Sequence, residues 1–177
     1  ERTGSSPVVL ITRQMEVPGT ESRVTLRTWV GSRDRLDFEA EIDWREIGTA
    51  GRGIPGLEVA FGHLDGSALP LADFDDEIDD EDELDDSMFE TKDLVFEVPF
   101  GVIKRPVDLD EVPTLRFVHD PNGGYTVLQD SKYGFWTTDR LAMRVLRSSF
   151  DPDHAPEVGK STLRYSVVFH DKEPSAA

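Results

Sequence analysis

Apolar and polar residues alternate in the first part of the chain. Across residues 36–44, apolar side chains alternate with acidic ones, which is the period of two expected when one face of a strand is buried. Two earlier segments, 8–17 and 23–30, are rich in apolar and β-branched residues, and proline, glycine and serine residues between the segments fit turns. The pattern therefore predicts three antiparallel strands in succession.

Further strands are predicted from shorter apolar runs. These runs are 57–61, 93–101, 114–119, 125–129, 141–147 and 161–170, and glycine- or proline-rich segments such as 48–56 and 121–124 lie between them. Apolar residues nowhere recur at helical spacing across a capped segment of about ten or more residues. With about ten strands and no substantial helix, the sequence predicts an all-β fold, an antiparallel β-sandwich.

The length of the chain predicts one domain, and its charge distribution predicts an acidic loop. A chain of 177 residues fits one domain, so we expect a single β-sandwich domain over 1–177. The formal net charge is −17, and eleven of the acidic residues lie in 73–86, which contains no basic residue. Self-repulsion there predicts a disordered acidic loop at about 72–90. Without those eleven residues the charge would be −6, which is ordinary for a domain of this size.

The acidic balance and the missing cysteines exclude several classes of function. Proteins that bind nucleic acids or anionic membranes need a basic surface that this chain lacks. The absence of cysteine excludes disulfides, thiolate zinc sites and cysteine nucleophiles. No apolar run is long enough to span a bilayer, and residues 1–6 do not resemble a signal peptide, so we expect a cytoplasmic protein. Because Glu1 is not an initiator methionine, we expect the chain to be processed or cut from something longer.

Local motifs for metal binding or catalysis are missing. The histidines are too widely spaced to form a local zinc motif and are expected to be satisfied side chains at strand ends or in loops: His63, His119, His154 and His170. No serine lies in a Gly-x-Ser-x-Gly motif. In the acidic run, Ile78 and Leu84 occupy the positions where a calcium loop requires glycine and glutamate. These observations predict no metal site and no catalytic residue in the chain.

Two other residue groups have both a structural and a functional interpretation. One predicted strand face carries four carboxylates, namely Asp37, Glu39, Glu41 and Asp43. They could include the pair of carboxyl groups that a glycosidase needs, but a strand face exposed to solvent is the favoured interpretation. Trp29 and Trp44 fit buried strand positions. Tyr133, Phe135 and Trp136 lie in a predicted turn beside Gly134, where partly exposed rings would suggest a partner surface or a ligand contact.

Four segments, in order along the chain, together carry a family resemblance. They are 35–44 (RLDFEAEIDW), 97–106 (EVPFGVIKRP), 129–153 (QDSKYGF, LAMRVLRSS and DPD) and 163–170 (LRYSVVFH). This set resembles the C-terminal β-sandwich domain of glycoside hydrolase family 38 α-mannosidases. The resemblance implies a sandwich of the galactose-mutarotase type, here an incomplete one.

The resemblance also implies an activity for the whole enzyme. Family members hydrolyse α-mannosidic bonds with retention, using a zinc ion and an aspartate nucleophile in an N-terminal α/β barrel. No segment of this chain resembles that barrel. The resemblance therefore implies a non-catalytic domain without a cofactor of its own, whose partners are a zinc-containing catalytic barrel of the same polypeptide and, through it, mannosides.

Five residues are candidates for facing the substrate or the barrel: Arg147, Lys132, Tyr133, Trp136 and Asp151. In some family members an arginine of this domain reaches toward the active site, and Arg147 matches it best. Its functional interpretation is electrostatic support of the substrate or of zinc-bound carboxylates, and the alternative is a strand-end ion pair with Asp151 or Asp153. Two other functions stay open, namely a free-standing carbohydrate-binding module that uses residues 133–136 and an interaction module whose acidic loop binds a basic partner.

Overall fold

The computed structural model describes residues 9–17, 19–31, 34–63, 92–107, 111–138, 140–153 and 157–170, except for the side chain of His63. Within these ranges the regular elements are all β-strands, as the alternation of apolar and polar residues predicted. The acidic loop predicted at about 72–90 and His154 lie outside the described residues.

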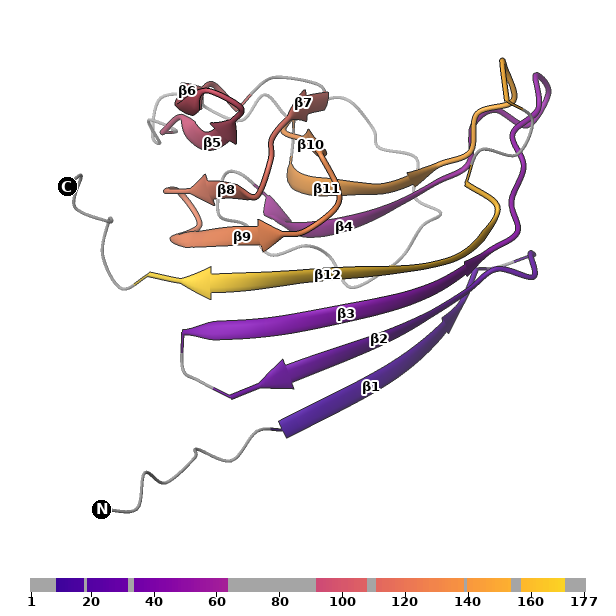
Figure 1. Cartoon of the computed structure of the whole chain (residues 1–177), viewed down its shortest axis with the longest axis horizontal. Coiled ribbons are helices and arrows are strands. Elements are labelled where there is room, and N and C mark those ends of the chain that lie inside the picture. The colour runs from indigo at the N-terminus through magenta and orange to yellow at the C-terminus, as the bar shows by residue number, and fades with distance from the viewer. Residues whose placement is uncertain are drawn as a thin grey trace, which may run out of the picture.

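The larger of two sheets contains eight strands, and every neighbouring pair is antiparallel. Their order in space is β1 (Val9–Glu16), β2 (Arg23–Val30), β3 (Arg35–Trp44), β12 (Gly159–Phe169), β9 (Tyr125–Gln129), β8 (Phe117–Asp120), β5 (Leu94–Val98) and β6 (Gly101–Arg105). The last strand, β12, lies between β3 and β9 and so joins the N-terminal three strands to the rest of the sheet (Figure 1).

The smaller sheet contains four strands and packs on the larger one. In order they are β4 (Gly56–His63), β11 (Arg140–Arg147), β10 (Gly134–Trp136) and β7 (Glu111–Pro113). One hydrophobic cluster takes side chains from both sheets, including Phe96 and Leu163 from the larger sheet and Phe135 and Met143 from the smaller one. The structure therefore confirms an all-β antiparallel sandwich.

The two tryptophans that were expected in the core lie in different environments. Trp44 is 2% exposed, as predicted. Trp29 is half-buried and pairs with Asp37 of the neighbouring strand, so it lies on the outer face of the sheet. The burial of Trp29 was therefore predicted wrongly. Val24 is a core residue, and because side chains alternate along a strand, an odd position such as 29 lies on the opposite face.

Several strand boundaries also differ from the prediction. The strand expected over 93–101 is a hairpin in which β5 ends at Val98 and β6 begins at Gly101. Gly101 has a φ of 153°, a conformation that favours glycine. The short strands β7 and β10 were not predicted. The segment with Phe135, expected to be a turn, is strand β10, and Phe135 is fully buried.

Burial of Tyr165 in β12 should make the domain less stable at alkaline pH. It is stacked on Phe38 with ring centroids 4.6 Å apart, and burial raises the pKa of Tyr165 from 10.0 to about 12. The contribution of the protonated side chain is complete below pH 10 and is lost as the pH rises to about 12, which amounts to about 2–3 kcal/mol. In urea unfolding at about pH 9 and 12, Tyr165→Phe should lose correspondingly less stability than the native chain. Equal losses in the two proteins would contradict the assignment.

Candidate functional site

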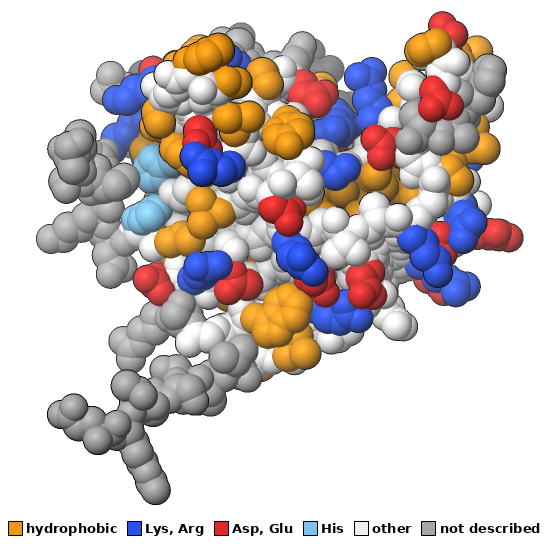
Figure 2. Space-filling view, viewed as in Figure 1, with side chains coloured by type: hydrophobic (Ala, Val, Ile, Leu, Met, Phe, Trp, Pro, Cys, Tyr) orange, Lys and Arg blue, Asp and Glu red, His pale blue; other side chains and the backbone are white. Residues whose placement is uncertain are grey.

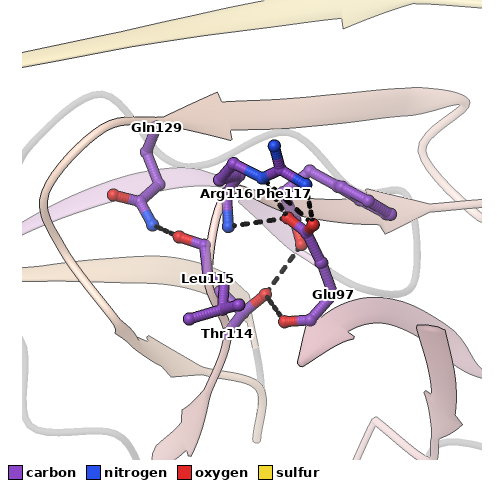
Figure 3. Close-up of polar contacts among 6 residues, drawn as sticks. All are labelled: Glu97, Thr114, Leu115, Arg116, Phe117 and Gln129. Carbon is purple, nitrogen blue, oxygen red and sulfur yellow. Dashed lines mark hydrogen bonds and ion pairs between the residues drawn. The ribbon is translucent and has the colours of Figure 1, made fainter. Parts of the chain in front are cut away.

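The loop that carries Lys132 and Tyr133 connects β9 with β10 and is held by Gln129. The Gln129 side chain is buried at the end of β9, and its Oε1 accepts hydrogen bonds from the backbone N–H groups of Ser131 (2.7 Å) and Lys132 (2.5 Å). Its Nε2 donates to the carbonyl oxygen of Leu115 (Figure 3). Gln129 was not selected from the sequence, although a side-chain amide at a strand end, two residues before a serine, is a local signal for such a turn.

An ion pair lies beside this loop, in which Glu97 is buried and the side chain of Arg116 is 80% exposed. The carboxylate of Glu97, at 9% exposure, lies 3.0 and 2.9 Å from Nε of Arg116 and also accepts from its Nη2 and its backbone N–H (Figure 3). The hydrogen bond and charge of Arg116 outweigh desolvation and lower the pKa of Glu97. Glu97 is therefore ionised at neutral pH and serves as a structural anion, since a general acid would need a raised pKa.

Thr114 contacts β5, β8 and the loop that carries Tyr133. Its hydroxyl lies 2.9 Å from the carbonyl oxygen of Glu97 and 2.8 Å from that of Phe117, so it donates to one of them at a time (Figure 3). Its backbone N–H donates to the carbonyl oxygen of Tyr133 at 2.8 Å. The backbone of Tyr133 is thus held by Thr114, and the two residues before it are held by the side chain of Gln129.

A depression of about 400 Å³ lies between the ion pair and the loop. Its lining includes Pro99, Val102, Asp130 and Tyr133. The side chain of Tyr133 is 58% exposed, and Phe100, at the tip of the β5–β6 hairpin, is fully exposed. Exposed apolar side chains gathered at one end of a sandwich are typical of an interaction surface.

The three aromatic residues near Gly134 do not form one stacking surface. Phe135 is fully buried, and Trp136 is half-buried with the guanidinium of Arg144 lying 5.3 Å from a ring centroid. Arg144 is itself fixed by an ion pair with Glu58 at 2.7 Å. Of the three rings, Tyr133 is the one that is largely exposed. The expected partial exposure is therefore wrong for Phe135.

Arg147 and Asp151 lie at the other end of β11. Trp136 pairs with Ala142 of this strand, and Arg147 lies five residues further on, about 17 Å along the strand. Both Arg147 and Asp151 are exposed, and within the described part of the chain no ion pair joins them. The connection that contains Asp151 projects from one end of the sandwich together with the loop after β3 (Figure 1). The five candidate residues thus form two separate groups.

Two histidines are satisfied as predicted. Nδ1 of His119 lies 3.0 Å from the Thr126 hydroxyl oxygen, and Nε2 of His170 lies 2.7 Å from the same atom. Among the described residues, no group of three or more histidine, aspartate or glutamate side chains is placed to hold a metal ion. The zinc ion of the resembling family therefore does not fit the residues described, and no reaction step is assigned through it.

Residues 8–155 match the protein family described as glycosyl hydrolases family 38 C-terminal domain. This chain belongs to that family. The match contains three of the four resembling segments, whereas β12 of the family 38 domain lies beyond residue 155. A comparison of this chain with curated proteins finds no match. None of the described residues of this chain belongs to a helix long and apolar enough to cross a membrane.

Proposed function

We propose that this family 38 domain is the non-catalytic C-terminal sandwich of an α-mannosidase. In this proposal, a zinc-containing catalytic barrel of the same polypeptide hydrolyses α-mannosidic bonds, and the sandwich braces it and lines one side of its sugar site. The observation that carries the proposal is the family match over residues 8–155. A cytoplasmic location is part of the proposal.

An exposed apolar surface on β1 supports a role in binding another domain. Val9, Ile11 and Met15 are 56%, 42% and 45% exposed. In the strand register Met15 lies opposite the core residue Val24, so these three side chains share the inner face of the large sheet. β1 is also an edge strand, whose outer backbone groups can pair with a further strand. An apolar face continuous with the core and an open edge are what docking against a second domain requires.

The remaining candidates are compatible with such docking. Arg147, Lys132 and Asp151 lie at strand ends or in connections, where an adjoining domain can contact them. We propose that Arg147 supplies positive charge toward the barrel, because it is exposed at the end of β11.

The test is hydrolysis of an aryl α-mannoside in the presence of added zinc. The chain of 177 residues should show no turnover, because the resembling family places its nucleophile and zinc ligands in the barrel. Turnover that survives purification would contradict a non-catalytic domain. A polypeptide that carries an α/β barrel in frame before this chain should show the activity, and Arg147→Ala in that polypeptide should lower kcat/KM by about tenfold or more if Arg147 reaches the site.

A further inference from the structure

The outer face of the large sheet carries an open groove whose lining contains none of the five candidate residues, although Asp130 lines both this groove and the depression beside Tyr133. The volume of the groove is about 680 Å³, and its lining comes from β2, β3, β12 and β9, including Trp29, Asp37, Leu128, Arg164 and Ser166. This volume is in the range of about 300–1,000 Å³ that is typical of small-molecule sites. Figure 2 shows acidic and basic side chains alternating across this face, with hydrophobic groups set among them.

One carboxylate in the groove is held in a fixed orientation. Oδ1 of Asp37 accepts hydrogen bonds from Nε of Arg35 at 2.8 Å, from its Nη2 at 2.6 Å and from the hydroxyl of Ser166 at 2.5 Å. Within the described ranges, no residue donates a hydrogen bond to Oδ2 of Asp37. Although desolvation opposes it, hydrogen bonding from Ser166 and Arg35 lowers the pKa of Asp37, so the carboxylate is ionised at neutral pH. Oδ2 is therefore a preorganised acceptor for a ligand hydroxyl.

The next row of side chains across the sheet is also hydrogen-bonded. Glu39 accepts from Arg27 Nη1 at 3.1 Å through one oxygen and from Arg164 Nε at 2.9 Å through the other. In and beside the groove, three guanidinium groups lie among four carboxylates: Arg27, Arg35 and Arg164 with Asp37, Glu39, Glu41 and Asp130. Because most of these charges are paired with one another and the net excess is a single carboxylate, the groove favours an uncharged ligand with several hydroxyl groups over a strongly charged one.

Trp29 supplies the apolar part of the groove. It lies directly opposite Asp37 in the β2–β3 register and is half-buried. Its cross-strand neighbour on the other side is Leu10, which is 52% exposed. An aromatic face beside charge-assisted hydrogen-bonding groups matches the two sides of a pyranose ring, one lined with C–H groups and the other with hydroxyls.

We propose that this groove is a binding site for an uncharged saccharide, with Trp29 stacking on the sugar ring and Asp37 accepting from its hydroxyls. The site goes beyond the proposed function, since it needs neither the barrel nor zinc. It also differs from the carbohydrate site expected at residues 133–136, because that segment presents a single largely exposed ring, Tyr133.

The test uses the 177-residue chain with methyl α-D-mannopyranoside and a mannotriose, followed by saturation-transfer NMR and by tryptophan fluorescence. We expect a Kd of about 1–10 mM, and Trp29→Ala and Asp37→Asn should each weaken binding by about tenfold or more. The matched control is Tyr133→Ala, which removes another exposed ring, one that does not line the groove, and should leave the Kd unchanged. Circular dichroism confirms that each variant is folded.

Two results would overturn the proposal. One is the absence of saturation transfer to either sugar at about 50 mM, well above the expected Kd. The other is binding that Tyr133→Ala abolishes while Trp29→Ala and Asp37→Asn leave it intact, which would place the site in the loop before β10. Neither result bears on the mannosidase proposal, since that is tested by hydrolysis with zinc and a barrel.

Discussion

Replacement of Trp44 by alanine is expected to lower the free energy of unfolding by about 3–5 kcal/mol. Trp44 ends β3 and is among the largest fully buried side chains. Its Nε1–H donates to the hydroxyl of Ser148 at 2.7 Å, directly after β11 of the other sheet. The substitution therefore leaves a cavity and removes a buried hydrogen bond between the two sheets.

Urea unfolding of two further variants separates these contributions. Ser148→Ala keeps the ring but leaves its N–H without the hydroxyl acceptor, so it should cost about 1–3 kcal/mol. Trp29→Ala removes a ring of the same size from the outer face, where the loss should be below about 1 kcal/mol. Similar losses for Trp29→Ala and Trp44→Ala would show that the two rings are not on opposite faces of the sheet.

The second large effect is expected at Phe135, where alanine should also cost about 3–5 kcal/mol. Phe135 lies in β10 between Val112 of β7 and Met143 of β11, and its side chain is fully buried. Because β10 is only three residues long, this side chain is its main anchor to the core.

Tyr133→Ala is the matched control, two residues away in the same segment. Its side chain is 58% exposed, so the cost should be below about 1 kcal/mol. In thermal unfolding, Phe135→Ala should lower the Tm by about 6–20 °C, while Tyr133→Ala should change it by a few degrees at most. A larger effect at Tyr133 than at Phe135 would contradict the strand register of β10.

The long strands could be predicted because each carries its own alternation. In β3, the side chains of Ala40, Ile42 and Trp44 are buried, and the acidic residues between them face outward, as the sequence indicated. The strands β7 and β10, of three residues each, carry too few residues to show a period. Their existence depends on hydrogen bonds to neighbours, such as the pairing of Gly134 with Pro113 in β7.

The candidate residues could be predicted in part. The motif at 129–135 does mark an ordered connection, but the residue that holds it is Gln129, through contacts with Leu115 across the sheet. The motif could not show that Trp136 lies opposite Ala142, five residues along β11 from Arg147. This arrangement follows from the register of β11 with its two neighbours. The register with β10 places Trp136 opposite Ala142, and the register with β4 places Arg147 opposite Gly56.

The sequence by itself determined that this protein is an all-β sandwich of glycoside hydrolase family 38 type, because strand periodicity and family motifs are local properties of the chain. Only the tertiary structure decided which side chains share a surface. Trp29, Asp37 and Arg164 meet because β12 lies between β3 and β9, and Trp44 reaches Ser148 because the two sheets pack face to face. Such contacts join residues more than 100 positions apart, and their geometry depends on strand order and register, which no local pattern specifies.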